Sequence, residues 1–477
     1  MGYKIGVDKK QLTLVPVSLD EYVPENHICR VIKAFTDQVD VNKEGYKYAE
    51  CKDRGCKPYD PRMMLSLYMY GYLHRVRSSR RLRDETRRNI EVMWLMDGLT
   101  PDDKTISNFR TNNKAALKQT FLEFVDMCRK VGLYGEEVIA TDGTKIRANN
   151  SLKKHFNKVV VTNELERIDK KINDYMDTLE KGDEEDAQEA EPGTDAINAA
   201  LEKLREKKAR YEELQSRIVA EGEISIVDPE ARLMRTGGDG RAIDVGYNVQ
   251  TVVDSKYHMI VDFEVTNNSC DAGNLYTMSE KAKEVLEVAT LTNLADKGYY
   301  SSEDMAACEE NGVTCIVAKK NVGGTIKTKE FSHESFNYNA DTDTYTCPCG
   351  NQLEFKRITK KNRGKEYRVY GNYKACVRCS RRSECTTYSN RVIWRLPHQD
   401  IAEIIDERTR LNKELYRKRQ EIIEHVFGTV KSVWGYRQYL CRTKSKVTAE
   451  TALAYLAYNM RRAVNIFKES GLMPEFE

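Results

Sequence analysis

Short apolar strands alternate with helices between residues 138 and 318, and this alternation most constrains the fold of the chain. Five runs read as strands: Val138–Ala140, the two arms of GYNVQTVVDSKYHMIVDFEVT, Leu291–Ala295 and Val313–Ala318. Helical segments, among them NLYTMSEKAKEVLEVA and Glu303–Glu310, lie between the later runs. Strands that alternate with helices are typical of a sheet covered by helices. The sequence therefore predicts an α/β fold for this part of the chain.

Two aspartates follow strands of this predicted sheet. Asp142 comes after the first strand and Asp296 after the fourth, each with a glycine close behind it. Ligands are usually held at strand ends, because the loops there leave room and the strands fix position. Two such carboxylates and one from a helix would form an oxygen-rich site for Mg²⁺ or Mn²⁺. With two ions, one could activate water or a 3′-hydroxyl while the other stabilises the leaving oxygen. For either aspartate alone, hydrogen bonds to neighbouring backbone amides are the better explanation.

The third carboxylate is expected on an amphipathic helix, residues 412–434. Its apolar residues recur at steps of three and four, as in a helix with one buried face; they are Leu415, Ile422, Val426, Val430 and Val433. A different face carries Arg417, Gln420, Glu424 and Lys431. A carboxylate with cations about two turns away on either side suits a site that holds a metal and a phosphate. The alternative is an ordinary core helix with a solvated charged face.

The N-terminal part of the chain reads as helices with many arginines. Asp60 and Pro61 are expected to begin one helix, and an arginine-rich helix follows Ser78 and Ser79. A helix, a short break and a further helix come next, which fits a helix-turn-helix or any α-hairpin. Residues 54–88 include ten basic and only three acidic residues, although the net charge of the whole chain is only +3. This asymmetry favours a nucleic-acid partner. We expect phosphate contacts from Arg80, Arg81 and Arg83 in particular.

A helical hairpin is predicted between the first strand and the rest of the sheet. Ile197, Leu204, Tyr211 and Ile218 repeat in sevens, which suggests two antiparallel helices. The acidic run EKGDEEDAQEAE, which starts at Glu180, is expected at the tip. We interpret the hairpin as an insertion and its carboxylates as solvated.

The cysteines indicate a reducing compartment and a metal site. The chain has thirteen of them, no apolar run long enough to cross a membrane, and no signal-peptide core at its start. We therefore expect a cytoplasmic protein whose cysteines are packed thiols or metal ligands. Five thiols between residues 347 and 385 have spacings that suit a small zinc knuckle. The expected zinc ligands are Cys347, Cys376, Cys379 and Cys385, with Cys349 as a competitor. Nearby Arg378, Arg381, Arg382 and Arg391 would suit contact with a DNA backbone or form a solvated rim.

Three blocks surround the candidate carboxylates, and together they carry a family resemblance. They read ATDGTKIRANNS, NLADKGYYS and YRKRQEIIEHVFGTVKSVWGYR. They resemble the catalytic blocks of bacterial insertion-sequence DDE transposases, in the group whose third block carries Tyr, Arg, Glu and Lys. The segments YDPRMMLSLYMYGYL and TISNFRTNN are similar to the N-terminal domain of the same enzymes. The resemblance implies an RNase H-like core, strand transfer with two divalent ions (Mg²⁺ or Mn²⁺), and double-stranded DNA as partner, both the terminal inverted repeats and the target. It further implies a homodimer in the DNA complex and a place at the bacterial nucleoid.

Matched residue by residue, the resemblance assigns roles to six side chains. Asp142, Asp296 and Glu424 match the acidic triad, while Tyr416, Arg419 and Lys431 match the helix block, with Lys431 expected on a DNA phosphate. The spacing departs from the family's simplest pattern, because four residues instead of three separate Arg419 from Glu424. By helical geometry Arg417 shares the face of Glu424, so the choice of arginine stays open. Glu421, three residues before Glu424, could also reach a metal.

The predicted organisation follows from these segments. It comprises a helical DNA-binding domain (1–135), an RNase H-like core (136–158 and 223–320), a helical-hairpin insertion (159–222), a Cys-rich insertion that binds zinc (321–400), and a catalytic helix followed by a packing helix (401–477). Two alternatives to a transposase are a nuclease on the same core that does not join strands, and a DNA-binding regulator without catalysis. The complete acidic triad disfavours the regulator.

Overall fold

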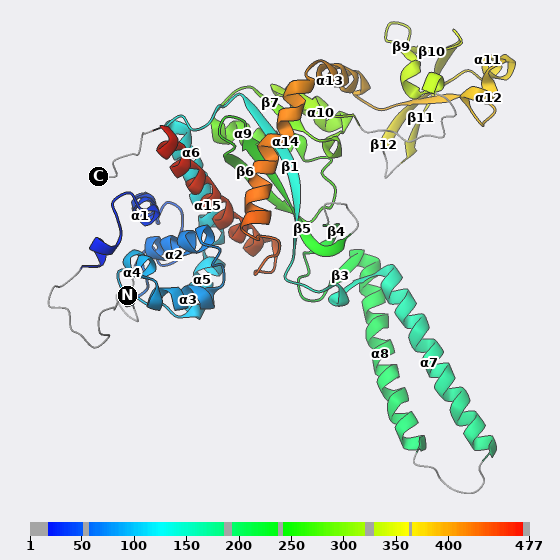
Figure 1. Cartoon of the computed structure of the whole chain (residues 1–477). Coiled ribbons are helices and arrows are strands. Elements are labelled where there is room, and N and C mark those ends of the chain that lie inside the picture. Colours follow the sequence, from blue (N-terminus) through cyan, green and yellow to red (C-terminus); the bar gives the residue numbers. More distant parts are fainter. Residues whose placement is uncertain are drawn as a thin grey trace, which may run out of the picture.

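A mixed sheet of six strands forms the centre of the molecule (Figure 1). The computed structural model describes residues 18–50, 57–185, 193–236, 242–319, 329–361 and 365–470. The strands are β1 (Val138–Arg147), β4 (Arg232–Arg235), β5 (Ile243–Asp254), β6 (Ile260–Thr266), β7 (Leu291–Ala295) and β8 (Val313–Val317). Their order is β4-β5-β1-β7-β8, and β6 also pairs with β5. β1 is antiparallel to β5 and parallel to β7, and β7 is parallel to β8. The predicted α/β fold is confirmed as a mixed α/β fold.

The first strand is longer than the sequence predicted. We expected it to end at Asp142, but β1 continues to Arg147. The reason is its antiparallel partner, since the pairing with β5 extends from Ile139 opposite Asp254 to Arg147 opposite Gly246. The parallel pairing with β7 stops at Thr141, so Asp142 lies where one neighbour ends and the other continues.

The N-terminal helices pack around the last helix of the chain. They are α1 (Ile28–Gln38), α2 (Pro61–Leu73), α3 (Ser79–Arg88), α4 (Ile90–Leu95), α5 (Asp103–Asn112) and α6 (Lys114–Lys130), preceded by a 3-10 turn at Leu19–Tyr22. Asp60 caps α2 as predicted, by accepting from the backbone N–H of Arg62. The arginine-rich helix is divided at Asn89, whose side chain caps α4. The C-terminal helix α15 (Lys444–Ser470) packs against α2 and α6, and most of its residues between Val447 and Ile466 are buried.

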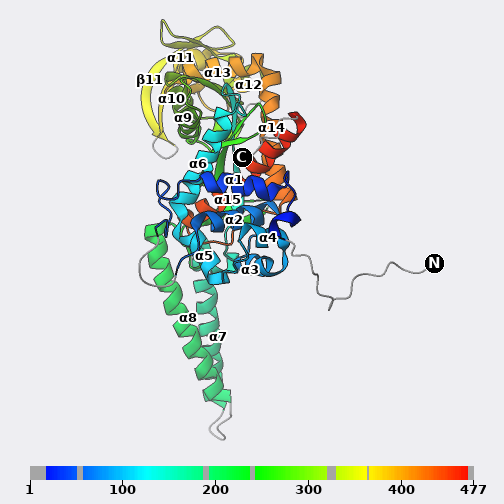
Figure 2. The ribbon, with the colours of Figure 1, turned by 90° about the vertical axis from the view of Figure 1, so that its left-hand side faces the viewer.

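A long helical hairpin projects from the body. Figure 1 and Figure 2 both show α7 (Lys158–Glu185) and α8 (Gly193–Glu221) side by side and pointing away from the sheet. At 1.5 Å per residue each helix is about 42 Å long. The short strands β2 (His155–Asn157) and β3 (Glu223–Ser225) pair at its base, after a 3-10 turn at Leu152–Lys154. The predicted hairpin is confirmed, while the tip at residues 186–192 lies outside the described residues.

A second, smaller sheet carries the cysteines, and the sequence analysis did not predict it. Five antiparallel strands follow the order β13-β12-β11-β10-β9, with α11 (Tyr373–Arg378) and α12 (Arg382–Cys385) beside them. The strands are β9 (Asn337–Asn339), β10 (Thr344–Thr346), β11 (Gln352–Lys361), β12 (Lys365–Gly371) and β13 (Val392–Arg395), preceded by 3-10 turns at Lys329–Phe331 and His333–Ser335. Their core is small and aromatic, formed by Phe336, Tyr345, Leu353, Tyr370 and Ile393. The many Lys, Arg and Glu residues of β11 and β12 masked the strand pattern.

The expected helix at residues 412–434 is present but changes its type. After α9 (Leu275–Leu286), α10 (Ser302–Glu310) and α13 (Gln399–Leu411), helix α14 spans Lys413–Phe427 and continues as a π-helical segment, Gly428–Val433. There the N–H of Trp434 donates to the carbonyl of Thr429 at 2.9 Å, and the Thr429 hydroxyl donates to the carbonyl of His425. This local side-chain bond competes with regular α-helical geometry. Among the described helices, none combines the length and apolarity needed to cross a bilayer.

Candidate active site

The two strand-end aspartates lie next to each other at one end of the parallel pair β1–β7. The register of this pair ends with Thr141 opposite Ala295, so the next residues on the two strands are Asp142 and Asp296. The parallel pairing brings Asp142 beside the end of β7, although β1 itself continues along β5, and residues far apart in the sequence therefore meet here. The structure thus brings together two of the three predicted acidic residues.

Asp142 lies in a half-buried position beside charges of both signs. Its Oδ1 accepts a hydrogen bond from the N–H of Gly143 at 2.8 Å, and its Oδ2 lies 3.4 Å from Nη1 of Arg419 on α14. Burial, and next to it the negative charge of Asp296, raise the pKa of the Asp142 carboxyl to about 6, although Arg419 acts in the opposite direction. Arg419 alone therefore does not neutralise the charges of Asp142 and Asp296, and a divalent cation would stabilise the two carboxylates further.

Asp296 is oriented by the backbone that follows it. It caps the 3-10 turn Lys297–Tyr299, and its Oδ1 accepts from the N–H of Gly298 at 2.6 Å. Both aspartates thus make hydrogen bonds to neighbouring backbone amides, as expected for an aspartate without a metal-binding role. Each does so through Oδ1, and these bonds fix the direction in which the carboxylate points.

Glu424 lies on the exposed side of α14, which packs against β1, β5 and β7. The helix buries Ile422, Ile423 and Val426, while the Glu424 carboxylate accepts from Nε2 of Gln420 at 2.7 Å. Glu421 has different surroundings, because its negative charge acts on His258 in the β5–β6 turn. The two glutamates therefore have different neighbours, and the Glu424 carboxylate makes its hydrogen bond within α14.

The arginine that reaches the aspartates is Arg419. Arg417, which helical geometry placed on the face of Glu424, is exposed, whereas Arg419 contacts Asp142. The half-buried Tyr416 lies under the Arg419 guanidinium, with 5.7 Å between its ring centre and Cζ. The sequence left the choice between Arg417 and Arg419 open, because the packing of α14 on β1 decides which arginine meets the sheet.

Lys431 also turns towards β1. Its Nζ donates to Oγ1 of Thr144 at 2.9 Å and to the carbonyl of Lys145 at 3.1 Å. Burial lowers the pKa of Lys431, and the cations Arg437 and Lys145 lower it further. The wider π-helical turn changes the direction of residues after Phe427 relative to a continuous α-helix. Lys431 thereby contacts β1 at Thr144, two residues after Asp142.

A third carboxylate, Asp271, lies beside the two aspartates and was missed by the sequence analysis. It belongs to the loop between β6 and α9, and its Oδ2 lies 3.4 Å from Nζ of Lys145. The charges of Asp142, Asp271 and Asp296 all act on the phenol of Tyr299. The sequence feature that could have indicated Asp271 is its position in a loop between a predicted strand and a predicted helix.

The carboxylates of this site could serve as oxygen ligands for hard cations. Oxygen ligands from Asp side chains are what Mg²⁺ and Mn²⁺ prefer. Within the described residues, no three carboxylates at this site have oxygen atoms that all lie within 4.8 Å of one another. Two ions a few ångströms apart require ligands that are spread more widely than those around a single ion.

The five cysteines of the second sheet line one small cavity of about 30 Å³. Sγ of Cys349 and Sγ of Cys379 are 3.8 Å apart, and the N–H of Asn351 donates to Sγ of Cys347 at 3.3 Å. With zinc–sulfur bonds of about 2.3 Å, two sulfurs of a tetrahedral site would be about 3.8 Å apart. The Cys349–Cys379 pair has this spacing. Cys349, which the sequence analysis left as a competitor, is thus as well placed as the four expected ligands.

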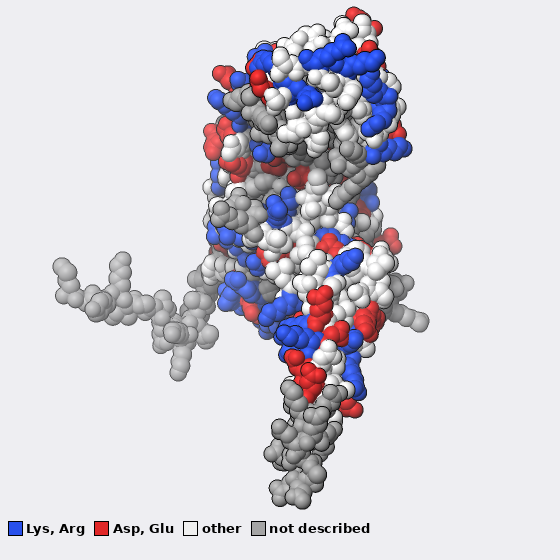
Figure 3. All heavy atoms as spheres, turned by 90° about the vertical axis from the view of Figure 1, so that its right-hand side faces the viewer, with Lys and Arg blue, Asp and Glu red and all other residues white. Residues whose placement is uncertain are grey.

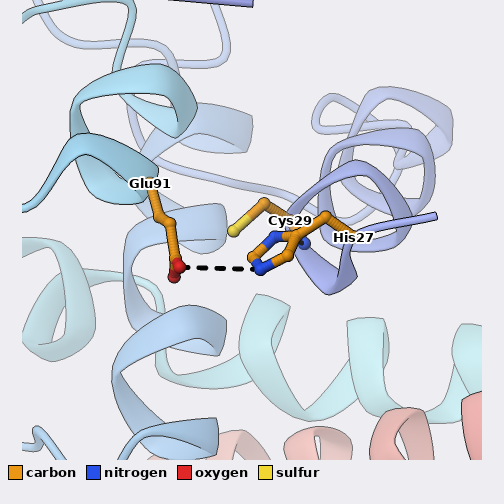
Figure 4. Close-up of side chains that lie close together, drawn as sticks. All are labelled: His27, Cys29 and Glu91. Carbon is orange, nitrogen blue, oxygen red and sulfur yellow. Dashed lines mark hydrogen bonds and ion pairs between the residues drawn. The ribbon is translucent and has the colours of Figure 1, made fainter. Parts of the chain in front are cut away.

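A separate group of possible metal ligands lies among the N-terminal helices, where His27, Cys29 and Glu91 come together (Figure 4). Nδ1 of His27 accepts from the N–H of Cys29 and so caps α1, while Nε2 lies 3.5 Å from Glu91. Glu91 also accepts from the hydroxyl of Tyr70 at 2.6 Å. Burial raises the pKa of the Cys29 thiol to about 12, which disfavours the thiolate that a metal needs. These contacts explain the group as a connection between α1, α2 and α4.

The predicted DNA-binding arginines of α3 differ in their surroundings. Arg83 is engaged with Asp84 at 2.8 Å and with Asp103 at 3.0 Å. Arg80 is 81% exposed, with Asp103 3.6 Å away, and Arg81 is exposed as well. Arg80 and Arg81 are therefore more available for phosphate contacts than Arg83.

Comparison with known proteins gives two family matches. The family described as Transposase domain (DUF772) matches residues 17–112, and the family described as Transposase DDE domain matches residues 346–464. A comparison with curated proteins found no match. Among solved structures, one similar chain is that of the piggyBac transposase synaptic complex with hairpin DNA, with 7% identity and a TM-score of 0.34, covering 94% of this chain and 77% of the other. That likeness is too weak to support an argument. The two family matches include α3 at one end of the chain and α14 at the other.

Proposed function

We infer the activity from the family: the chain is a DDE transposase of the insertion-sequence type, and such enzymes are metal-dependent polynucleotidyl transferases. We propose that it binds the terminal inverted repeats of an insertion sequence, cleaves the DNA there and joins the freed ends to target DNA. The observation that carries this proposal is the meeting of Asp142 and Asp296 at the edge of β1–β7, with α14 packed on the same strands.

An RNase H-like core is part of the proposal. The order β6-β5-β1-β7-β8, antiparallel up to β1 and parallel beyond it, supports such a core. In this arrangement β1 supplies Asp142 from the middle of the sheet, and β7 supplies Asp296 at its end. We further propose the division of the chain into N-terminal DNA-binding helices, a core, a hairpin insertion, a Cys-rich insertion and C-terminal helices.

Asp142, Asp296 and Glu424 are the residues that would hold Mg²⁺ or Mn²⁺. When bound, two such ions activate the attacking oxygen and stabilise the leaving one. Arg419 orients Asp142 through its contact with Oδ2. Glu424, which accepts from Gln420, would have to leave that contact to bind such an ion. Lys431, supported by Thr144, presents its ammonium group to a DNA phosphate beside the carboxylates.

DNA contacts are proposed for two surfaces. Arg80 and Arg81 on α3 would bind phosphates of the terminal repeats, with a smaller contribution from Arg83. Figure 3 shows Lys and Arg side chains gathered over the upper part of the molecule, where the second sheet lies. Its exposed basic residues include Lys356, Arg357, Lys360, Arg368, Lys374, Arg378 and Arg382. This surface would follow the DNA backbone, and a homodimer would hold two element ends together.

Zinc in the Cys-rich insertion completes the proposal. Four of the five thiols would bind one ion, and the 3.8 Å spacing supports Cys349 and Cys379 as one pair among them. The N–H group that Asn351 directs at Cys347 would stabilise a thiolate. The role is structural, because the aromatic core of the second sheet is small.

A strand-joining assay tests the proposed function. Labelled DNA that carries the element ends is incubated with Mg²⁺ and a target plasmid, and cleaved and joined products are separated on a gel. The transposase produces both, and Asp142→Asn, as the matched control, produces neither. Cleavage without joining would identify the nuclease alternative, and DNA binding without cleavage would identify the regulator.

A further inference from the structure

Asp271 occupies the space between the two catalytic strand ends. A Cβ atom on Gly143, the residue after Asp142, would lie only 2.4 Å from Oδ1 of Asp271. A Cβ atom on Gly298, whose N–H binds Asp296, would lie 3.4 Å from Oδ2 of Asp271. No side chain fits at Gly143 without displacing the Asp271 carboxylate. The two glycines therefore keep open the space in which the three aspartates meet.

Two buried amides hold the Asp271 carboxylate in place. Oδ1 accepts from Nδ2 of Asn248 at 2.7 Å and from Nε2 of Gln250 at 2.8 Å, both on β5. Both side chains are almost completely buried, with 0% and 1% exposure. Amide donors that fix a carboxylate from behind are typical of the second layer around a metal site.

An unpaired oxygen points into the same space. Oδ1 of Asn248 is buried and has no hydrogen-bond partner within the described part of the chain. It would lie 2.8 Å from a Cβ atom on Gly143, so it is directed towards the gap beside Asp142 and Asp271. A buried acceptor without a donor destabilises the fold, and a cation or a water molecule bound to a cation would satisfy it.

We propose that Asp271 is an additional carboxylate ligand of the divalent-metal site, positioned by Asn248 and Gln250. The inference rests on the proposed function, because it assumes that Asp142 and Asp296 bind metal. Asp271 meets the metal through Oδ2, the oxygen that the two amides leave available. The ammonium group of Lys145 lies on that side of Asp271, with 3.4 Å between Nζ and Oδ2. Metal and Lys145 thus compete for Asp271.

Titration calorimetry of the full-length protein with Mn²⁺ tests this assignment. Asp271→Asn keeps an oxygen for both amide donors but removes the charge, and we expect at least a tenfold loss of Mn²⁺ affinity with an unchanged melting temperature in EDTA. Glu264→Gln, on the neighbouring strand β6, is the matched control and should bind like the wild type. Asp142→Asn should lose binding.

The outcomes separate this inference from the proposed function. If Asp142→Asn loses binding and Asp271→Asn binds like the wild type, Asp271 is not a ligand and the proposed site stands. If Asp142→Asn also binds like the wild type, the proposed metal site itself is wrong. Lys145→Met gives a second measurement that does not depend on how Asp271→Asn folds. It should tighten Mn²⁺ binding several-fold, and an unchanged or weaker affinity would contradict the competition.

Discussion

Glu421 and Glu424 lie three residues apart on α14 but have different neighbours. Substitution of one is therefore a control for substitution of the other. Glu424→Gln should reduce Mg²⁺-dependent cleavage of labelled end DNA by about 100-fold or more, because a lost carboxylate ligand weakens the metal site. DNA binding in gel shifts should stay nearly the same. Glu421→Gln should be mild, because the charge of Glu421 acts on His258 and no contact joins it to the aspartates within the described residues. The opposite ranking would exclude Glu424 from the triad.

The raised pKa of Asp142 predicts a dependence of stability on pH. The ordinary value of 3.8 is raised to about 6 in the folded protein, so the folded state binds the additional proton. The stabilisation from this proton is complete at low pH and is lost as the pH rises through about 6. In EDTA, Asp142→Asn should therefore gain about 1–2 kcal/mol of unfolding free energy relative to the wild type between pH 4.5 and pH 7. Denaturant unfolding at both pH values measures this difference, and a constant difference would show that Asp142 is not perturbed.

The sequence predicted the acidic residues of the strands, but it did not predict their neighbours. Asp142 and Asp296 were found because each follows an apolar run that could be recognised locally. Asp271 was missed because its loop has no distinct pattern, and its position depends on side chains of β5. Helical angles within one helix left the choice between Arg417 and Arg419 open, whereas the contact of Arg419 with Asp142 depends on how α14 packs on β1.

At the scale of secondary-structure elements, the second sheet allows a direct test of the predicted zinc site. Its five thiols line one cavity over a small aromatic core, so we expect one zinc ion per chain. Cys376→Ser combined with Cys379→Ser should lose the zinc and make residues 329–395 sensitive to protease. Elemental analysis of the purified protein measures the metal. Cys349→Ser and Cys385→Ser, compared singly, identify the fourth ligand, and retention of zinc in the double variant would place the ion elsewhere.

Element types were predictable where the pattern was local, and their lengths were not. The helical hairpin, the β5–β6 hairpin and α6 follow from apolar periodicity and turn residues. β1 exceeded its apolar run because its partner β5 extends further. The π-helical segment after Phe427 depends on the Thr429 hydroxyl and on burial of Val430, which a regular helical period does not reveal.

For the whole molecule, the salt dependence of DNA binding measures the phosphate contacts. If Arg80 and Arg81 each bind one phosphate, replacing both with Ala should reduce the slope of log affinity against log salt by about 2. Arg83→Ala should change the slope less, because Asp84 and Asp103 already engage that side chain. Fluorescence anisotropy on end DNA from 50 to 200 mM salt gives the slopes. Equal slopes for the double variant and the wild type would place the contacts elsewhere.

The position of α15 has a consequence for how the protein is made. This helix is the last one in the chain, yet it forms the centre against which α2 and α6 of the N-terminal part pack. While the ribosome is still synthesising α14, α2 and α6 lack this packing partner. We therefore expect α2 and α6 to complete their packing only after residues 444–470 have left the ribosome. A chain cut short before α15 would lack the packing partner of both helices, so we expect its N-terminal helices to be cleaved by proteases faster than those of the longer chain.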